Sequence, residues 1–519
     1  MADWSDGYVT DSIYTNNFHH QQRPTDIHLS CLLAGVTPPP LENFTYCDLG
    51  FGRGRTVTAL AACHGNSEFW GTDFIADHVL EARRHAEHVG LENVHLFDDS
   101  FEEFLNRDTP QFDYITLHGI YSWVSLQVRQ QICALLHKKL KVGGVVMISY
   151  NTLPGWAPLM AMREIMIAAM GGRIDRRPEA VHAAMKFVGD LAKNGTPGLP
   201  MGPHQRRLAA DFGGRNIAYL IHEYCNEHLT AFYAHEVAAD MAEAKLSYVG
   251  DAEHAHAISM ATLGDSLKKI GDILTTPERQ HGLLDFVRPS TFRSDVFMRG
   301  KVALNSADRR AMLESVTLAA LAPEGHVRHM LAVPENEKNQ AANFPREGIA
   351  LMARALGDGP KTVAELRQAS GIQHEPTMIL ALSIMISQFF AFPTYGPTPG
   401  NKTMEWNKKS LETLVERGHQ ATILSSELRS AVKMSWIEQN FLAGDLAETD
   451  PVAFAIAQYK RHAGVSEGAP EASKETEDLE ERVKQMFDAF QQSYRPQLDR
   501  LGLGLPTAAA ATGDITHPA

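Results

Sequence analysis

Five apolar runs, each followed by a segment with helical periodicity, alternate through residues 44–151 of the chain. The runs are FTYCDLG, EFWGTDF, VHLFDDS, FDYITLHG and VVMISYN, which begin at residues 44, 68, 94, 112 and 145. Apolar runs of this length are typical of strands that are buried on both faces of a sheet. Strands that are joined by helices form a parallel sheet with helices on both sides. The pattern therefore predicts an α/β fold with an open, doubly wound sheet.

Two later segments are interpreted as strands six and seven of the same Rossmann-like sheet: residues 246–249 and 292–301. The sequence between the fifth and sixth strands has a helical pattern and is expected to cover the ligand edge of the sheet. The helix that precedes the fifth strand, SLQVRQQICALLHKKLKVGG, is expected to end at its glycines. The predicted domains of this half are a cofactor-covering segment at 1–40, a cofactor-binding core at 41–155, a helical insertion at 156–232 and the end of the sheet at 233–305.

The C-terminal half has a different pattern, and it predicts a winged-helix-like, mostly helical domain over residues 325–500. Its third helix would read DNA in a DNA-binding protein, but residues 378–390 contain no lysine or arginine. A helix that is apolar on most of its surface is buried and does not enter a groove. We therefore expect a structural or protein-contact domain, followed by a disordered tail at 501–519.

Charge and cysteine content exclude several classes of protein. The formal net charge is −14, which argues against a general nucleic-acid binder, because phosphates are neutralised by clustered lysine and arginine. The five cysteines include no C-x-x-C pair, so no zinc site or disulfide framework is predicted. The sequence has no signal-peptide pattern and no apolar stretch long enough to span a bilayer. A cytoplasmic protein without a membrane partner is the expectation.

The first strand runs into a loop with closely spaced glycines, DLGFGRG at residues 48–54. Its spacing is G-x-G-x-G, whereas dinucleotide-binding loops have G-x-G-x-x-G. A dinucleotide places its pyrophosphate on the N–H groups at a helix start, where the Asp48 carboxylate would repel it. S-adenosylmethionine has no phosphate, and a carboxylate attracts its ammonium and sulfonium groups. Asp48, Gly50, Gly52 and Gly54 are therefore predicted to bind S-adenosylmethionine.

Acidic residues also end the second and third strands. Asp73 can accept hydrogen bonds from both hydroxyls of a ribose, although a nicotinamide cofactor would need the same acid. Asp99 can accept a hydrogen bond from the adenine amino group, and its neighbour Asp98 is the alternative. Phe74 and Ser100 adjoin these acids and are included among the predicted cofactor-binding residues.

Several longer motifs resemble a known family. DLGFGRG, GTDF, FDYITLHGIYSWV, VGGVVMISYNTLPGW and YLIHEY occur in this order in class I methyltransferases that carry a methyltransferase regulatory domain. The resemblance covers residues 8 to 300 and is looser after HEY. Similar members include bacterial protein lysine methyltransferases, such as the rickettsial enzymes that act on outer-membrane proteins. The resemblance implies S-adenosylmethionine as the cofactor and cofactor roles for the glycine loop, Asp73 and Asp99, but it does not fix the substrate.

The acceptor side is predicted from the end of the fourth strand, HGIYSWV. Aromatic faces there can hold a sulfonium or a substrate ammonium by cation–π attraction, and Trp123 has the alternative of packing under the next helix. An apolar mouth also favours the neutral form of a lysine amine. The candidates for aligning the amine are Tyr14, Tyr121, Tyr150 and Tyr224, and those for taking its proton are His118 and Glu223. Other residues expected beside the acceptor are Trp123, Asn151, Trp156 and His222.

The segment HEYCNEH, residues 222–228, contains two histidines that suggest a metal site. His222 and His228 are six positions apart, which puts them on different faces of a helix, and the H-E-x-x-H spacing is missing. We therefore predict no metal at this segment. Its residues are expected to line the substrate mouth or to hold the insertion together.

These patterns predict a methyltransferase that acts on a protein, on lysine. One alternative is a methyltransferase for a small metabolite or natural product. A second alternative, from another class, is a binding module that uses the cofactor structurally. A nicotinamide-dependent oxidoreductase is disfavoured by the spacing of the glycine loop. The oligomeric state is not predicted.

Overall fold

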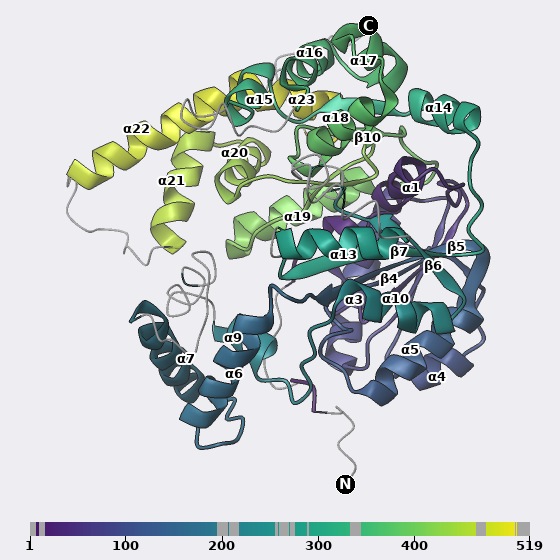
Figure 1. Ribbon diagram of the computed structural model, residues 1–519. Coiled ribbons are helices and arrows are strands. Elements are labelled where there is room, and N and C mark those ends of the chain that lie inside the picture. The colour runs from purple at the N-terminus through teal and green to yellow at the C-terminus, as the bar shows by residue number, and fades with distance from the viewer. Residues whose placement is uncertain are drawn as a thin grey trace, which may run out of the picture. The chain divides into compact units, whose positions relative to one another are not determined.

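The computed structural model describes residues 7–9, 16–194, 206, 217–254, 258, 269, 276–287, 290–332, 344–462, 474–503 and 505. The chain divides into two compact units (Figure 1). Unit 1 comprises residues 1–57, 68–84 and 94–310, and unit 2 comprises residues 58–67, 85–93 and 311–519. The predicted residues Tyr14 and 196–203 lie outside the described part of the chain.

Unit 1 is built on one seven-stranded sheet with the order β3-β2-β1-β4-β5-β7-β6. Neighbours from β3 to β5 are parallel, whereas β7 is antiparallel to both β5 and β6. The predicted sixth and seventh strands are confirmed. The strands are β1 (Thr45–Leu49), β2 (Glu68–Thr72), β3 (Val94–Phe97), β4 (Phe112–Leu117), β5 (Leu140–Asn151), β6 (Leu246–Asp251) and β7 (Phe292–Arg299).

Helices precede, connect and follow these strands, with local sequence signals at several of their ends. Ser100 and Glu103 form a capping box at the start of α4, and Ser125 caps α5. The helices are η1 (His20–Gln22), α1 (Pro24–Leu33), α2 (Arg55–Cys63), α3 (Ala76–Val89), α4 (Phe101–Asn106), α5 (Leu126–Lys139), α6 (Ala157–Ala169), α7 (Pro178–Lys193), α9 (Ile217–Tyr224), α10 (Ala234–Glu243), α13 (Pro277–Val287) and α14 (Ser306–Ser315).

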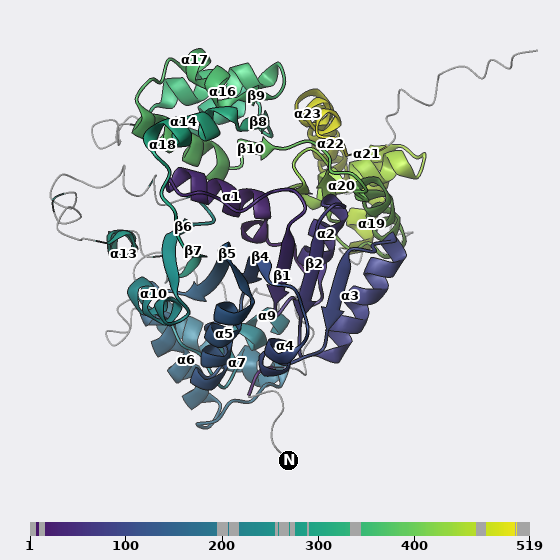
Figure 2. The same ribbon diagram turned by 90° about the vertical axis from the view of Figure 1, so that its right-hand side faces the viewer.

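The two faces of the sheet are both covered, as the apolar runs predict. Cys47 and Ile115 are paired on neighbouring strands and belong to a core with side chains from α5 and α10. The adjacent pair Tyr46 and Tyr114 points the other way, and their hydroxyls donate to carbonyls of Gln22 and of the segment after α1. Figure 2 shows α1 on one side of the sheet and α4, α5 and α10 on the other.

The expected boundary between α5 and the fifth strand is wrong. The helix ends at Lys139, and β5 already begins at Leu140, which pairs with Phe112 of β4. Leu140 has extended dihedral angles, and its side chain is buried in the core below α5. The glycines that we expected to end the helix lie inside β5, and the register of β4 and β5 shifts beside them.

Helices α6, α7 and α9 come from the predicted insertion and form an apolar core of their own. Leu159 and Met166 of α6, Val181 and Val188 of α7 and Leu220 of α9 are at most 2% exposed. The three helices lie together in Figure 1. We call this group the cap, residues 156–194 and 217–227.

Unit 2 contains a three-stranded sheet with the order β10-β8-β9, a β11-β12 pair and ten helices within the described residues. The expected third helix is present as α18, with Met378, Leu382 and Met385 at most 2% exposed. The winged-helix assignment stays a prediction. The elements are β8 (Thr317–Ala320), α15 (Glu324–Met330), α16 (Arg346–Gly357), β9 (Lys361–Thr362), α17 (Val363–Ser370), α18 (Glu375–Ser387), β10 (Ala391–Thr394), α19 (Thr403–Arg417), β11 (Ile423–Ser425), β12 (Ser430–Val432), α20 (Trp436–Leu446), α21 (Pro451–His462), α22 (Lys474–Ala489), the π-helix η4 (Phe490–Tyr494) and α23 (Arg495–Arg500).

The beginning of the expected disordered tail is ordered, which corrects the prediction for its first residues. Leu501 and Leu503 are 1% and 4% exposed. The carbonyl of Leu503 accepts a hydrogen bond of 2.8 Å from Asn407 Nδ2. These two leucines bury apolar area, which offsets the cost of ordering the chain. No helix among the described residues combines the length and the apolar character needed to cross a membrane.

Candidate functional site

A pocket in unit 1 lies at the carboxyl ends of β1, β2, β3 and β4. Parallel sheets of this kind place their ligands at this edge. The pocket contains two carboxylates and no lysine or arginine among the described residues that line it. Its lining consists of Tyr8, Gly50, Gly52, Asp73, Phe74, Ile75, His78, Asp99, Ser100, Phe101, His118, Gly119, Ile120, Trp123, Val124, Val128, Gln131 and His222.

The glycine loop forms one wall of the pocket. Gly50 and Gly52 have φ angles of 75° and 58°, in the left-handed region that glycine adopts without strain. A side chain at Gly50 would come within 2.6 Å of Ile120 Cδ1, whereas the space around Gly52 is open to 4 Å. The loop can therefore bring its backbone close to a ligand at Gly52.

The Asp73 carboxylate connects the glycine loop to the end of β2. One oxygen accepts a 2.8 Å hydrogen bond from the Gly52 N–H, and the other accepts from the Ile75 N–H at 3.1 Å and lies 3.2 Å from His78 Nδ1. The side chain is 7% exposed. A carboxylate offers about four acceptor sites, so Asp73 retains capacity for a ligand hydroxyl while it holds the loop.

Asp99 and Ser100 line the pocket at the end of β3. The Asp99 carboxylate accepts two hydrogen bonds from the Arg107 guanidinium, one of them at 2.7 Å. This bidentate pair fixes the plane of the carboxylate. Ser100 is the N-cap of α4 and accepts from the Glu103 N–H.

His118 follows β4 and is buried against a second histidine. Its ring centroid lies 4.0 Å from that of His19 and 5.6 Å from that of Phe292. Burial lowers the pKa of His118 well below its usual value, and the nearby His19 lowers it further; burial also lowers the pKa of His19 to about 4. Both imidazoles are therefore neutral at pH 7, and His118 Nδ1 is buried without a hydrogen-bond partner among the described residues.

Aromatic rings from three separate segments surround the rest of the pocket. Tyr8 lies edge-on to Phe74, with ring centroids 5.8 Å apart, and its ring is 6.3 Å from that of His222 in α9. Trp123 is 6% exposed and donates through Nε1 to the Glu223 carbonyl at 3.4 Å. Trp123 thus lines the pocket and also packs against the chain at the end of α9.

The lining suits S-adenosylmethionine better than a dinucleotide. The described lining has no lysine or arginine, and although Arg107 compensates the charge of Asp99, the Asp73 carboxylate accepts only from backbone N–H groups and lies beside His78. The Asp73 carboxylate attracts an ammonium or a sulfonium and repels a pyrophosphate. Neutral His118 adds no positive charge near a sulfonium. The open space at Gly52 and the spare acceptor capacity of Asp73 provide room and a partner for a nucleoside.

The pocket brings together many, but not all, of the residues predicted from the sequence. Those in its lining are Gly50, Gly52, Asp73, Phe74, Asp99, Ser100, His118, Trp123 and His222. Gly54 has a φ of 77°, and its Cα faces Ala82 of α3, which a side chain would meet at 2.4 Å. The absence of a side chain at Gly54 therefore allows the glycine loop to pack closely against α3.

Tyr121 and Tyr150 lie in the core, contrary to the prediction that they align the acceptor. Both are 0% exposed. The Tyr121 hydroxyl donates to Asp240 of α10, and the Tyr150 hydroxyl donates to Asp295 of β7, each at 2.6 Å. Their hydroxyls are directed to carboxylates that come from later segments of the chain.

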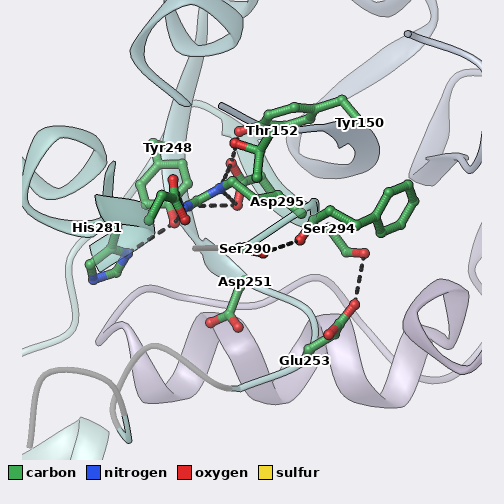
Figure 3. Close-up of polar contacts among 12 residues, drawn as sticks. Tyr150, Thr152, Tyr248, Asp251, Glu253, His281, Ser290, Ser294 and Asp295 are labelled. Atoms are coloured by element: carbon green, nitrogen blue, oxygen red, sulfur yellow. Dashed lines mark hydrogen bonds and ion pairs between the residues drawn. The ribbon is translucent and has the colours of Figure 1, made fainter. Parts of the chain in front are cut away.

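Asp295 belongs to a buried polar network at the ends of β5, β6 and β7 (Figure 3). Arg293 donates to the carboxylates of Asp295 and Asp285, at 3.0 Å and 2.9 Å, and to the Tyr248 hydroxyl at 3.2 Å. Tyr248 in turn lies 2.9 Å from His281 Nδ1 on α13. This network ties α13 to the sheet and has no member in the pocket lining.

The remaining acceptor-side predictions also fall outside the pocket lining. Asn151 is 1% exposed and bonds through its backbone to Ser122 and Phe232. Trp156 and Tyr224 are 3% and 4% exposed, with ring centroids 5.9 Å apart in the core of the cap. Glu223 meets Trp123 through its carbonyl. Of the residues predicted in α9, His222 lines the pocket, whereas Glu223 and Tyr224 do not.

Several pocket residues were missed by the sequence analysis. Ile75 and His78 lie two and five positions after Asp73, and the apolar Ile120 and Val124 belong to the HGIYSWV motif itself, so their positions near predicted residues gave a signal. Tyr8 had no such signal, because it comes from the N-terminal segment, where we chose Tyr14 instead. No group of three His, Cys, Asp or Glu side chains suited to a metal ion occurs within the described ranges.

Asp48 lies behind the glycine loop and gives a testable pH dependence. It is 1% exposed, and one oxygen accepts from Gln22 Nε2 at 2.8 Å and from Thr116 Oγ1 at 3.2 Å. Burial raises its pKa to about 7 in spite of these hydrogen bonds. The folded protein therefore holds a proton that the unfolded chain releases near pH 4, and stability falls as the pH rises from about 4 to about 7.

We expect the Asp48→Asn variant to gain stability over the parent chain between pH 5 and pH 8, by about 2–3 kcal/mol. Asparagine keeps the acceptor oxygen and cannot ionise, so it avoids the buried charge. Thermal melts of both proteins without cofactor at the two pH values measure this difference. A difference that is the same at pH 5 and pH 8 would show that Asp48 does not titrate in this range.

Comparisons with known proteins agree with this geometry. Residues 47–144 match the family described as "Methyltransferase domain", and residues 216–299 match the family described as "Predicted methyltransferase regulatory domain". An uncharacterized protein of Synechocystis is 33% identical over 96% of this chain and 99% of its own length. An uncharacterized protein of Rickettsia prowazekii is 28% identical over 54% of this chain and 50% of its own length. PKMT2 from Rickettsia typhi, solved in complex with AdoHcy, shares the fold with a TM-score of 0.66 and 19% identity over 95% of this chain and 100% of that chain.

Proposed function

Because the chain belongs to the class I S-adenosylmethionine-dependent methyltransferases that carry a methyltransferase regulatory domain, we propose that it methylates a protein, with the side-chain amine of lysine as the acceptor. The observation that carries the acceptor class is the group of aromatic side chains, Tyr8, Phe74 and Trp123, that line the pocket together with His118. The motifs shared with bacterial protein lysine methyltransferases and the fold shared with PKMT2 along nearly the whole chain also support it.

The residues proposed to hold the cofactor are those at the strand ends. Asp73 would accept from the ribose, Asp99 and Ser100 would lie beside the adenine, and the backbone at Gly50 and Gly52 would pass close to the remainder. S-adenosylmethionine supplies a methyl group on a positively charged sulfur, which is a good leaving group without acid catalysis. The chain therefore contributes alignment and exclusion of water, which account for much of the acceleration in such reactions.

A lysine acceptor must lose its proton before it can attack. Removal of water by the aliphatic side chains of the lining, Ile120, Val124 and Val128, favours the neutral amine over the ammonium. His118 Nδ1 has no hydrogen-bond partner among the described residues, and in the tautomer that carries its proton on Nε2 it can accept a hydrogen bond from the amine, which would orient the amine. The lowered pKa of His118 makes imidazole a poor resting place for the proton, so we propose that the proton leaves through water.

The acceptor class can be tested with methyl-labelled S-adenosylmethionine and a bacterial extract that has been separated into a protein and a small-molecule fraction. We expect label in the protein fraction. The Asp73→Ala variant should transfer almost none, since it lacks the proposed ribose acceptor. Label that enters only the small-molecule fraction would overturn the protein acceptor and favour a metabolite.

A further inference from the structure

The HEYCNEH segment has no metal-site spacing, and within the described residues it does something else: it holds part of the N-terminal segment. Residues 7–9, which we call the strap, make backbone contacts with this segment. The Gly7 carbonyl accepts from the Glu227 N–H at 3.1 Å, and the Val9 N–H donates to Asn226 Oδ1 at 2.8 Å. Asn226 is 1% exposed, and its Nδ2 donates to the His222 carbonyl. One buried amide thus joins the strap to α9.

Two arginines of the cap hold the same segment from the other side. Arg163 donates to the carbonyls of Tyr224 and Asn226 at 3.0 Å and 2.6 Å. Arg176 donates to the Cys225 carbonyl at 3.2 Å and to the Gly7 carbonyl at 2.9 Å. Carbonyls at the end of a helix lack intrahelical partners and attract cations. Arg176 therefore bridges the end of α9 and the strap.

The strap is shaped to fit this position. Gly7 has a φ of 73°, and a Cβ at Gly7 would lie 2.5 Å from Glu227 Cβ and Oε2. Any other residue would meet both the strained backbone and the clash. Because Gly7 has no side chain, the backbone at Glu227 can come close enough to donate its N–H to the Gly7 carbonyl, which also accepts from Arg176.

Between the two fixed residues of the strap, Tyr8 is directed into the cofactor pocket. It lines the pocket together with Asp73, Phe74 and His222. Its ring is edge-on to Phe74, with centroids 5.8 Å apart. The hydrogen bonds given above for the backbone of Gly7 and Val9 all lead to the cap, so the cap sets where this ring lies.

We infer that Arg176 and Asn226 are positioning residues for S-adenosylmethionine binding, which act through the strap by placing Tyr8 against the cofactor pocket. Neither residue lines the pocket. The inference concerns cofactor binding and does not depend on a lysine acceptor. An unchanged affinity for S-adenosylmethionine would refute the inference and leave the proposed acceptor standing, and a different acceptor would leave the inference standing.

The test is a thermodynamic cycle measured by calorimetric titration of the full chain with S-adenosylmethionine. We expect Tyr8→Ala and Arg176→Ala each to raise the Kd about tenfold, which is about 1.4 kcal/mol. The double variant should bind no more weakly than either single variant, because Arg176 has nothing to position once Tyr8 is gone. Arg176→Lys should recover part of the affinity. The matched control is Arg177→Ala, since Arg177 is the neighbouring arginine and pairs with Asp175 at the surface; its Kd should change less than about twofold.

Two results would overturn the inference. One is an Arg176→Ala protein with the parent melting temperature and the parent Kd. The other is a double variant in which the two effects multiply, which would mean that Arg176 acts independently of Tyr8. If Arg176→Ala does not fold, Gly7→Ala or Asn226→Ala replaces it in the cycle with Tyr8→Ala. An unchanged Kd, or two effects that multiply in the double variant, would again overturn the inference.

Discussion

Replacing Asp73 with alanine is expected to weaken the binding of S-adenosylmethionine by about 30- to 1000-fold, which is about 2–4 kcal/mol. Two losses add up in this variant. The carboxylate is the proposed acceptor for the ribose hydroxyls, and it also holds the Gly52 N–H at 2.8 Å and the Ile75 N–H at 3.1 Å. Without it, the glycine loop loses its connection to the end of β2.

Calorimetric titration of the parent chain, Asp73→Ala and Asp73→Asn measures this effect. Asp73→Asn keeps one acceptor oxygen and should be intermediate. The matched control is Asp77→Ala, because Asp77 is an exposed acid in the first turn of the neighbouring α3 and should leave the Kd nearly unchanged. An Asp73→Ala protein that melts at the parent temperature and binds the cofactor as tightly as the parent would show that this pocket does not hold S-adenosylmethionine.

Replacing Arg293 with methionine is expected to lower the free energy of unfolding by about 3–5 kcal/mol. Arg293 is 3% exposed in its side chain, and its carboxylate partners Asp285 and Asp295 are 6% and 1% exposed. The substitution removes the cation and leaves two carboxylates in the interior. Removing one member of a buried ion network costs more than removing all of it, because an uncompensated charge remains.

Thermal melts should show a fall of about 6–20 °C for Arg293→Met, from about 2–4 °C for each kcal/mol in a unit of this size. A triple variant that also carries Asp285→Asn and Asp295→Asn should regain part of the loss. Arg279→Ala is the control, since Arg279 is an exposed residue of the same α13 and should stay within about 0.5 kcal/mol of the parent. A melting temperature that is unchanged in Arg293→Met would mean that the network of Figure 3 does not stabilise the chain.

The parts of the site that could be predicted are those fixed by local sequence. An apolar run that stops at an acid or a glycine marks the end of a strand, and the ends of parallel strands meet at one edge. Gly50, Gly52, Asp73, Asp99 and His118 were found in this way, and all of them line the pocket. The two late strands were predicted from their own apolar segments and are confirmed as β6 and β7, whereas the order of the strands was not predicted.

The parts that could not be predicted depend on contacts between distant segments. Tyr121 follows the end of β4 and Tyr150 is the last but one residue of β5, but their hydroxyls donate to Asp240 and Asp295, which are 119 and 145 positions away. The sequence shows that a tyrosine is near a strand end, but it does not show whether the side chain points into the core or into the pocket. Tyr8 is in the pocket because Val9 bonds to Asn226, 217 positions along the chain.

The measurement that tests the account most directly is the identity of the amino acid that receives the methyl group. Proteins labelled by the purified chain with methyl-labelled S-adenosylmethionine are hydrolysed completely, and the labelled amino acids are separated. We expect the label to be recovered as methylated lysine and to be lost with the Asp73→Ala variant. Label on another side chain, or equal label with Asp73→Ala, would contradict it.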